Sequence, residues 1–205
     1  DLLTGIVVKT PEGPYYNAMI SLGVSGRGHY YKRHLVPFGE FLPLKPLLDP
    51  VLGFLDIPMS DFAEGGNGKP LITLAGQPAG IDICYEDAFA DEVMRALPGA
   101  TYLINASNDA WFGDSLAPHQ HLQIARMRAL ESGRFLLRAT NTGISAIINP
   151  RGELRGSIPQ FEQAILTDRI QPLRGMTPYA RWGDTPLVAL AGLLLAVAAL
   201  RWLRR

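Results

Sequence analysis

The sequence predicts an α/β domain with a mixed β-sheet, followed by one helix that spans a membrane. Two apolar runs near the start are separated by a turn rich in Pro and Gly, which is typical of an antiparallel hairpin. Further apolar runs alternate with two helical segments, as they do in α/β domains. A run of fifteen residues near the end, 186–200, contains no charged residue. The hairpin and the helices together favour mixed over wholly parallel strand pairing.

The composition excludes several classes of protein. The chain has 205 residues, enough for one domain with a core and an appendage. Lys and Arg together number 19, as do Asp and Glu, which excludes a strongly basic nucleic-acid-binding protein. Since 47% of the residues are hydrophobic and 19% are charged, the chain is also not of a disordered type.

Short apolar runs bounded by Gly, Pro and Asn predict the strands. The turn at 11–14 joins the first two, and Pro37 ends the third. The chain begins at Asp1, directly before the first strand, so we expect it to be a piece of a longer protein. The predicted strands cover residues 2–8, 16–22, 30–36, 72–74, 80–84, 102–104, 135–138, 144–148, 153–156 and 164–168.

Two segments have the features of helices. Residues 87–97 precede Pro98 and Gly99, which stop a helix. Residues 118–133 carry an apolar stripe at helical spacing, with charged residues between its members. The stripe consists of Leu122, Ala125, Ala129 and Leu130.

Residues 186–200 have the composition of a membrane helix. With 201–203 the segment reaches eighteen residues, or about 27 Å at about 1.5 Å per residue, against about 30 Å for a bilayer core. Arg201 can extend its charge to the interface, and Trp202 suits the interfacial belt. A buried core helix is the alternative, but such a helix is usually amphipathic, whereas this segment is apolar on every face.

Basic residues set the expected orientation of this helix. Arg201, Arg204 and Arg205 follow the apolar run, and the positive-inside rule places them in the cytoplasm. Arg174 and Arg181, on the other side of the run, weaken this assignment. We therefore expect a domain at 1–175 on the outer side, a linker at 176–184, and a membrane helix with a basic cytoplasmic end at 185–205.

Cys84 lies where a predicted strand ends and a predicted helix begins. Backbone N–H groups and the positive end of the helix dipole stabilise a thiolate at such a turn, and the same N–H groups can bind an oxyanion. A covalent nucleophile has these requirements. A buried structural cysteine is the alternative.

Lys32 lies between aromatic and apolar residues of the predicted strand 30–36. If its side chain points into the domain, its ammonium needs a partner and would stabilise negative charge. A surface lysine is the alternative. Glu40 and Glu86 are open to the same two interpretations, a buried carboxylate or a surface acid. Two carboxylates and a lysine around one thiol would form an acid–base site.

A loop at 105–113 is polar at first and then aromatic, and it follows a predicted buried strand. Such a loop suits the rim of a pocket at a strand end. Ordinary Asx turns are the alternative interpretation. The candidate rim residues are Asn105, Asn108, Trp111 and Phe112.

No metal or other cofactor is expected. His119 and His121 are two residues apart, whereas two ligands on one helix face are four apart. A single cysteine allows neither an intramolecular disulfide nor a Cys-rich zinc site.

Several motifs together resemble the apolipoprotein N-acyltransferase family, a membrane-bound branch of the nitrilase (carbon–nitrogen hydrolase) superfamily. The resemblance covers nearly the whole chain and is to the C-terminal part of that family. The motifs HLVPFGE and SNDAWF are specific in combination, whereas a lysine followed by a cysteine is not. The matching segments are 31–41, 83–86, 105–112, 120–131, 138–145 and 177–181.

The resemblance implies a nitrilase-like α-β-β-α sandwich, truncated at its N-terminus, and a Glu-Lys-Cys triad. Cys84 corresponds to the nucleophile and Lys32 to the triad lysine. Glu40, Tyr85 and Glu86 match positions that support the site. The family's triad glutamate lies upstream and nothing here matches it, so we expect the chain to be inactive alone.

The resemblance also implies a function. The family moves a fatty acyl chain from a phospholipid, through a cysteine thioester, to the α-amino group of the N-terminal diacylglyceryl-cysteine of an apolipoprotein. The expected partners are a phospholipid acyl donor, an apolipoprotein acceptor and the bacterial inner membrane, with the catalytic domain facing the periplasm and with no nucleic acid or metal. The alternatives are a membrane-tethered nitrilase or amidase that hydrolyses a C–N bond, and a non-catalytic lipid-binding fragment.

The segment 42–70 is long, rich in Pro and Gly, and apolar. Loops of this length are often functional, and this one could form a lipid entrance at the membrane interface. Covering the domain's own core is the alternative. The candidate entrance residues are Leu47, Leu48, Val51, Leu52, Phe54 and Leu55.

Overall fold

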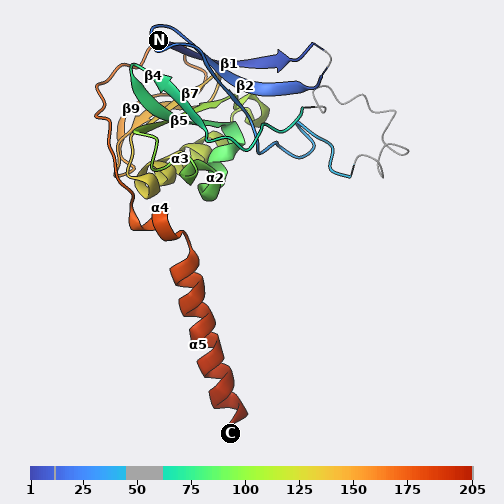
Figure 1. Ribbon diagram of the computed structural model, residues 1–205, viewed down its shortest axis with the longest axis vertical. Coiled ribbons are helices and arrows are strands. Elements are labelled where there is room, and N and C mark those ends of the chain that lie inside the picture. The colour runs from blue at the N-terminus through green and yellow to red at the C-terminus, as the bar shows by residue number, and fades with distance from the viewer. Residues whose placement is uncertain (12, 45–61, 205) are drawn as a thin grey trace.

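The computed structural model describes residues 1–11, 13–44 and 62–204. Figure 1 shows a layered domain with the N-terminus at its top, from which the last helix, α5 (Thr185–Leu203), extends as a separate rod to the C-terminus. The candidate lipid-entrance residues between 47 and 55 lie outside the described residues.

A three-stranded antiparallel sheet opens the chain. It consists of β1 (Leu2–Lys9), β2 (Tyr15–Leu22) and β3 (Gly28–Tyr31), in that order. The register pairs Leu2 with Leu22 and Lys9 with Tyr15, so the predicted hairpin is confirmed.

A six-stranded sheet forms the centre of the domain, in the order β4-β5-β6-β7-β8-β9. The pairs β5–β6 and β6–β7 are parallel, and the other three pairs are antiparallel, which confirms the predicted mixed sheet. Parallel neighbours require a crossover, and helical segments provide both. The strands are β4 (Leu71–Leu74), β5 (Gln77–Ile83), β6 (Tyr102–Ser107), β7 (Leu136–Thr140), β8 (Ser145–Ile148) and β9 (Leu154–Ile158).

The helical segments are mostly short. The longest in the domain, α3 (Ala117–Ser132), ends at Gly133, whose φ of 64° is a conformation that glycine adopts without strain. This helix is close to the predicted 118–133. The other segments are the 3₁₀ helices η1 (Cys84–Ala88) and η2 (Ala110–Phe112), and the helices α2 (Ala90–Met94) and α4 (Pro178–Trp182).

Two apolar clusters define three layers. One cluster joins Met19 and Tyr30 of the small sheet to Ile72 and Ile81 of the central sheet. The other joins central-sheet residues such as Leu103 to the α2 and α3 side. In Figure 1, α2 and α3 accordingly lie below the central sheet, and β1 and β2 lie above it. Helix, sheet and sheet are three of the four layers of the predicted α-β-β-α sandwich.

The predicted strand 30–36 is wrong in its bounds, because β3 ends at Tyr31. The N–H of Lys32 still donates to the Asn17 carbonyl of β2 at 2.8 Å, but the backbone N–H groups after it leave the ladder. Those of Arg33 and His34 instead donate to the Glu86 carboxylate, at 2.8 and 3.2 Å. A side chain distant in sequence therefore ends this strand.

The predicted helix 87–97 is wrong in its continuity. The chain turns helical at Cys84, breaks at Phe89, whose φ and ψ are −104° and 99°, and resumes as α2 from Ala90 to Met94. The N–H of Phe89 closes the first segment by bonding the Glu86 carbonyl at 3.0 Å.

The predicted strand 164–168 does not belong to either sheet. This segment contacts the edge strand β9 through side chains rather than through a backbone ladder. Arg155 pairs with Asp168 at 3.0 Å, and Leu166 lies against Gly156.

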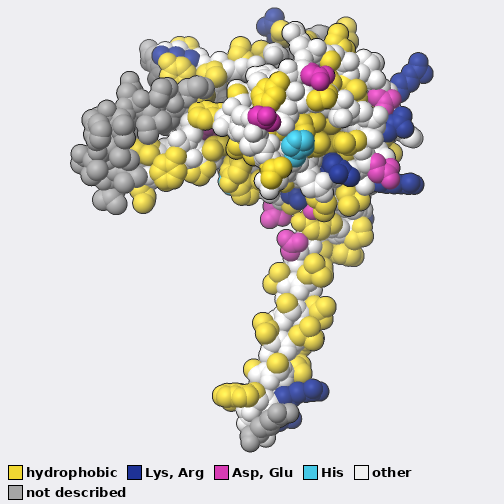
Figure 2. All heavy atoms as spheres, turned by 180° about the vertical axis from the view of Figure 1, so that it is seen from behind, with side chains coloured by type: hydrophobic (Ala, Val, Ile, Leu, Met, Phe, Trp, Pro, Cys, Tyr) yellow, Lys and Arg dark blue, Asp and Glu magenta, His cyan; other side chains and the backbone are white. Residues whose placement is uncertain are grey.

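The last helix has the features predicted for it. Among the described residues, α5 is the one helix long and apolar enough to cross a membrane, and none of its described residues is buried. Figure 2 shows hydrophobic side chains along its visible face and basic ones at its far end. The alternative of a helix buried in this domain is therefore wrong.

Candidate active site

Cys84 follows β5 directly and begins η1. Its φ is 53°, a left-handed conformation that costs a residue with a side chain roughly 1–2 kcal/mol. Such conformations are concentrated at functional sites, where the surrounding structure holds them. The thiol is free and its residue is half-buried, so the turn presents a sulfur at the end of a central strand.

Lys32 is almost completely buried, and its ammonium pairs with the Glu40 carboxylate. The Nζ atom lies 2.9 Å from Oε1 and 2.8 Å from Oε2 of Glu40. Glu40 also accepts hydrogen bonds from Asn17 Nδ2 and from the N–H of Val36, both at 2.8 Å. Both side chains are thus fixed in place, and neither is the surface group that the sequence left open.

Glu86 is buried and joins the Cys84 turn to the segment that carries Lys32. One of its oxygens accepts from Tyr30 Oη at 2.8 Å and from the N–H groups of Arg33 and His34; the other accepts from the N–H of Ile83 at 2.7 Å. Burial raises the pKa of Glu86, and these backbone donors oppose the shift. The carboxyl group therefore holds two distant segments together around the turn.

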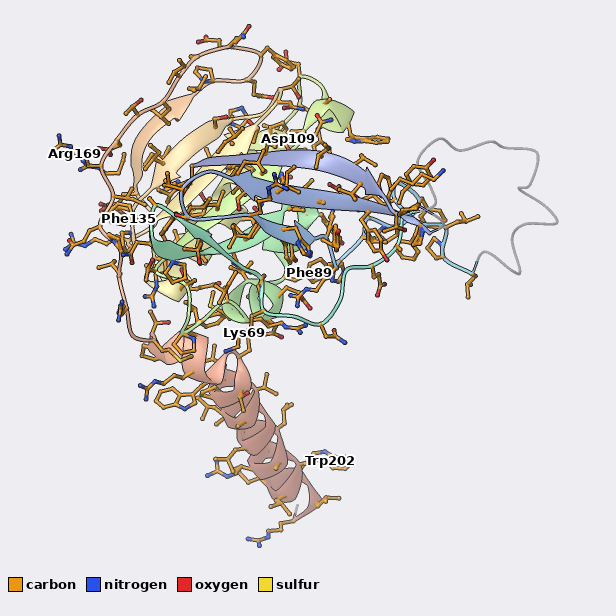
Figure 3. The ribbon with its side chains drawn as sticks, turned by 45° about the horizontal axis from the view of Figure 1, so that its top comes forward. Lys69, Phe89, Asp109, Phe135, Arg169 and Trp202 are labelled. Atoms are coloured by element: carbon orange, nitrogen blue, oxygen red, sulfur yellow. The ribbon has the colours of Figure 1, made fainter. Side chains whose placement is uncertain are left out.

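Aromatic rings surround the outer side of the turn. His34 stacks on Phe89 with ring centroids 3.6 Å apart, and the Tyr85 ring meets Phe89 edge-on at 5.0 Å. Tyr85 is 36% exposed. Figure 3 labels Phe89 beside these short helical segments.

A buried polar cluster lies against the inner side of the turn, and sequence reasoning missed it. His121 Nε2 and Asn105 Nδ2 each lie 3.3 Å from the Cys84 carbonyl oxygen. The remaining members are Asp87, Asp109 and Arg138. The available signal was Arg138, an arginine in the middle of an apolar strand.

Two pKa values in this cluster are strongly shifted. Burial opposes the charge on His121, but its hydrogen bonds to Asp109 and Asp87 outweigh burial and raise its pKa to about 10. Burial also opposes the charge on Asp109, yet bonds from His121 and Ser107 and the charge of Arg138 lower its pKa to about 2. Both groups are therefore charged at neutral pH.

Asp82, on β5, is a buried acid beside this cluster. Burial, and after it the charge of Asp87, raise the pKa of Asp82 well above its ordinary value. Its Oδ1 accepts from Asn105 Nδ2.

The four candidate rim residues do not share one environment. Asn105 is completely buried under the Cys84 turn, so its assignment to a rim is wrong. Asn108 is exposed, and its Oδ1 accepts from the N–H of Ala110 at 3.2 Å, which is the Asx turn given as the alternative. Trp111 and Phe112 are exposed.

Two hollows among the described residues lie away from Cys84. One, of about 490 Å³, is lined by Phe135, Arg151 and Arg169, among others. Phe135 precedes β7 whereas Cys84 follows β5, and because these strands run in the same direction the hollow is at the opposite end of the sheet. The other, of about 600 Å³, lies at the base of α5 and includes Tyr179 and Trp182.

The described residues contain no cluster of three or more His, Cys, Asp or Glu side chains that could hold a metal ion. His119 is exposed and contacts Gln160, whereas His121 belongs to the buried cluster.

The paired sheets, with a cysteine at the turn from strand to helix, define a nitrilase-like α/β protein. Solved structures share this fold. A carbon–nitrogen hydrolase from Helicobacter pylori is 18% identical, with a TM-score of 0.58 over 78% of this chain and 58% of its own. An amidase of the nitrilase superfamily from Nesterenkonia is 19% identical, with a TM-score of 0.56 over 77% and 56%.

The chain belongs to the carbon–nitrogen hydrolase family, whose sequence pattern matches residues 2–179. Within it, the chain resembles proteins named apolipoprotein N-acyltransferase. The one from Methylococcus capsulatus is 50% identical over 98% of this chain, and the one from Nitrosomonas europaea is 49% identical over 98%. The chain spans about 40% of the length of each relative.

Proposed function

We propose that this chain is part of an apolipoprotein N-acyltransferase that carries an acyl group on Cys84. The observation that carries the proposal is the Cys84 turn, tied through Glu86 to the segment that bears the Lys32–Glu40 pair. The identity of 50% with a relative of that name supports the choice of reaction. Cys84 and Lys32 are the proposed catalytic residues, and Glu40, Tyr85 and Glu86 support them.

In the first half-reaction a base takes the Cys84 proton, and the thiolate Sγ attacks the ester carbonyl carbon of a phospholipid. The carbonyl oxygen becomes an oxyanion, which the Lys32 ammonium and the N–H of Tyr85 stabilise by roughly 3–4 kcal/mol for each donor. The C–O ester bond then breaks, and the leaving alkoxide takes from the base the proton that Cys84 lost, which gives lysophospholipid. A thioester remains on Cys84. The proposed base is the family's triad glutamate, from outside this chain.

In the second half-reaction the α-amino group of a diacylglyceryl-cysteine attacks the thioester carbonyl. A second oxyanion forms at the same donors, and the attacking nitrogen loses a proton to the base. The oxyanion then collapses to an amide as the Cys84 thiolate leaves and takes that proton back. This double displacement predicts a burst of acyl-enzyme formation before steady turnover.

We further propose that α5 anchors residues 1–175 to the outer face of the bacterial inner membrane through the linker 176–184. The apolar surface of α5 and the basic residues at its end support this arrangement. A tag at Arg205 should then be accessible from the cytoplasm, and access from the periplasm alone would contradict it. The apolar residues between 47 and 55 remain the proposed lipid entrance.

A hydrolase is the second candidate function. The solved structure from Nesterenkonia is an amidase with this fold, and an amidase needs the same thiol and ammonium but uses water as the acceptor. The apolar, unburied α5 favours a lipid substrate over a small soluble amide.

The adduct on Cys84 tests the proposal. After exposure of the full-length protein to phospholipid, we expect mass spectrometry to find one acyl group on the peptide that contains Cys84. Cys84→Ala removes the sulfur and should remove the adduct completely, while His119→Gln, an exposed change, should keep it. An acyl group retained in the Cys84→Ala protein would contradict the assignment.

A further inference from the structure

Five buried polar side chains meet under the Cys84 turn, and the proposed chemistry uses none of them. Each is at most 8% exposed, and they come from five places in the chain: η1, β6, the loop after β6, α3 and β7. Figure 3 labels one member, Asp109, at the end of the loop that follows β6. We call this set the buried cluster; its members are Asp87, Asn105, Asp109, His121 and Arg138.

The ring of His121 donates at both nitrogens. Its Nδ1 lies 3.0 Å from Asp109 Oδ1, and its Nε2 lies 3.0 Å from Asp87 Oδ1. A ring between two carboxylates carries both protons, because each nitrogen faces an acceptor. The single Nε2–H is shared between Asp87 Oδ1 and the Cys84 carbonyl oxygen, 3.3 Å away, as a three-centre hydrogen bond.

Arg138 orients Asn105, whose side-chain nitrogen is the second donor to the Cys84 carbonyl oxygen. Its Nη2 lies 2.9 Å from Asp109 Oδ2, and its Nη1 lies 3.3 Å from Asp87 Oδ2 and 2.6 Å from Asn105 Oδ1. A guanidinium only donates, so the Asn105 oxygen must face it. The Asn105 nitrogen consequently faces the Cys84 carbonyl oxygen at 3.3 Å.

We propose that His121 is a positioning residue that, with Asn105, holds the Cys84 carbonyl and thereby sets the direction of the Tyr85 N–H as an oxyanion donor. This inference rests on the proposed acyl transfer at Cys84. In a planar trans peptide the carbonyl of one residue and the N–H of the next point in opposite directions. Anchoring the Cys84 oxygen in the buried cluster therefore directs the Tyr85 N–H away from it. The same two bonds offset the cost of the left-handed conformation of Cys84.

The buried cluster has no net charge, and the variant used to test it should keep it neutral. Two carboxylates balance one imidazolium and one guanidinium, so removal of His121 alone leaves a buried negative charge and can unfold the protein. The paired change His121→Gln with Asp87→Asn removes one charge of each sign. His119→Gln is the matched control, because His119 lies on the same helix but is exposed.

The experiment compares two reactions of Cys84 in the full-length protein. Acyl transfer from phospholipid forms an oxyanion, whereas alkylation by iodoacetamide displaces iodide from a saturated carbon and forms none. For the paired variant we expect kcat for acyl transfer to fall by about 10²-fold, as for loss of one oxyanion donor, with the KM for phospholipid unchanged. We expect alkylation of Cys84, followed by mass spectrometry, to keep its rate, and His119→Gln to keep both rates.

Three results would overturn the inference. One is an unchanged kcat in the paired variant. Another is an equal fall in acyl transfer and alkylation, which would mean that the buried cluster only maintains the fold. The third is failure of the paired variant to fold, which would also mean that the buried cluster only maintains the fold. Absence of any acyl adduct on wild-type Cys84, measured first, would instead reject the proposed function.

Discussion

Burial of the Lys32 ammonium costs free energy unless a partner replaces its lost hydration, and the Glu40 carboxylate does so at 2.8 Å. The pair is itself held by Asn17 and by the N–H of Val36. A charge fixed in this way needs little reorganisation when an oxyanion forms, which is the basis of electrostatic catalysis.

Lys32→Met should therefore lower kcat for acyl transfer by about 10²- to 10³-fold in the full-length protein. Lys69→Met is the matched control, because Lys69 is exposed, and it should have no effect. Steady-state rates with a defined phospholipid check this. Retention of more than about a tenth of the wild-type rate would show that the ammonium is not an oxyanion donor.

His121 should make stability depend on pH. Its pKa is raised in the folded protein from 6.5 to about 10, so the charged ring contributes stability that is fully present below about pH 6.5. That contribution is lost as pH rises through about 10. We expect the melting temperature of the full-length protein to fall over this interval, and less steeply in the paired His121→Gln and Asp87→Asn variant. An equal slope in both proteins would contradict the assignment.

At the scale of elements, the sequence predicts those helices and strands whose bounds depend on neighbouring residues. The hairpin of β1 and β2, and the helix α3 with Gly133 at its end, follow from alternation, helical spacing and turn residues. The early end of β3 depends on Glu86, which is distant from β3 in sequence. No local pattern contains that contact.

The candidate site, like the fold, could be predicted from the sequence only in part. Cys84 at the turn and the Lys32 motif are visible in the sequence, but the pairing of Lys32 with Glu40 is visible only in the structure. Arg138 in an apolar strand was a local sign of the buried cluster, but the cluster as a whole could not be predicted. Asp and Arg usually lie at the surface, and Asp87, His121 and Arg138 come from separate elements.

Close contact between the helical layer and the central sheet requires a glycine at position 80. A Cβ there would lie 2.6 Å from Leu103 Cδ2 and 2.8 Å from Ala96 Cβ. We expect Gly80→Ala to destabilise the domain by about 1–3 kcal/mol through overpacking, measured as a lower melting temperature. Gly66→Ala, where a Cβ would contact nothing within 4 Å, is the control, and an equal effect of both changes would contradict this account.

At the scale of the whole molecule, a nitrilase-like domain is attached to an unburied apolar helix. The proposed function assigns the two parts different tasks: the helix anchors the protein at the membrane, and the α/β domain carries Cys84. The chain spans about 40% of the length of its relatives, so the complete acyl transfer is proposed for the full-length protein.

The most direct measurement follows the acyl group after it has reached Cys84. The full-length protein is loaded with phospholipid, freed of excess lipid, and chased with a diacylglyceryl-cysteine peptide or with buffer alone. The account predicts that the adduct on Cys84 disappears with the peptide, that the acyl group appears as an amide on its α-amino group, and that the adduct persists in buffer. Release of free fatty acid at the same rate in both chases would contradict acyl transfer and identify a hydrolase.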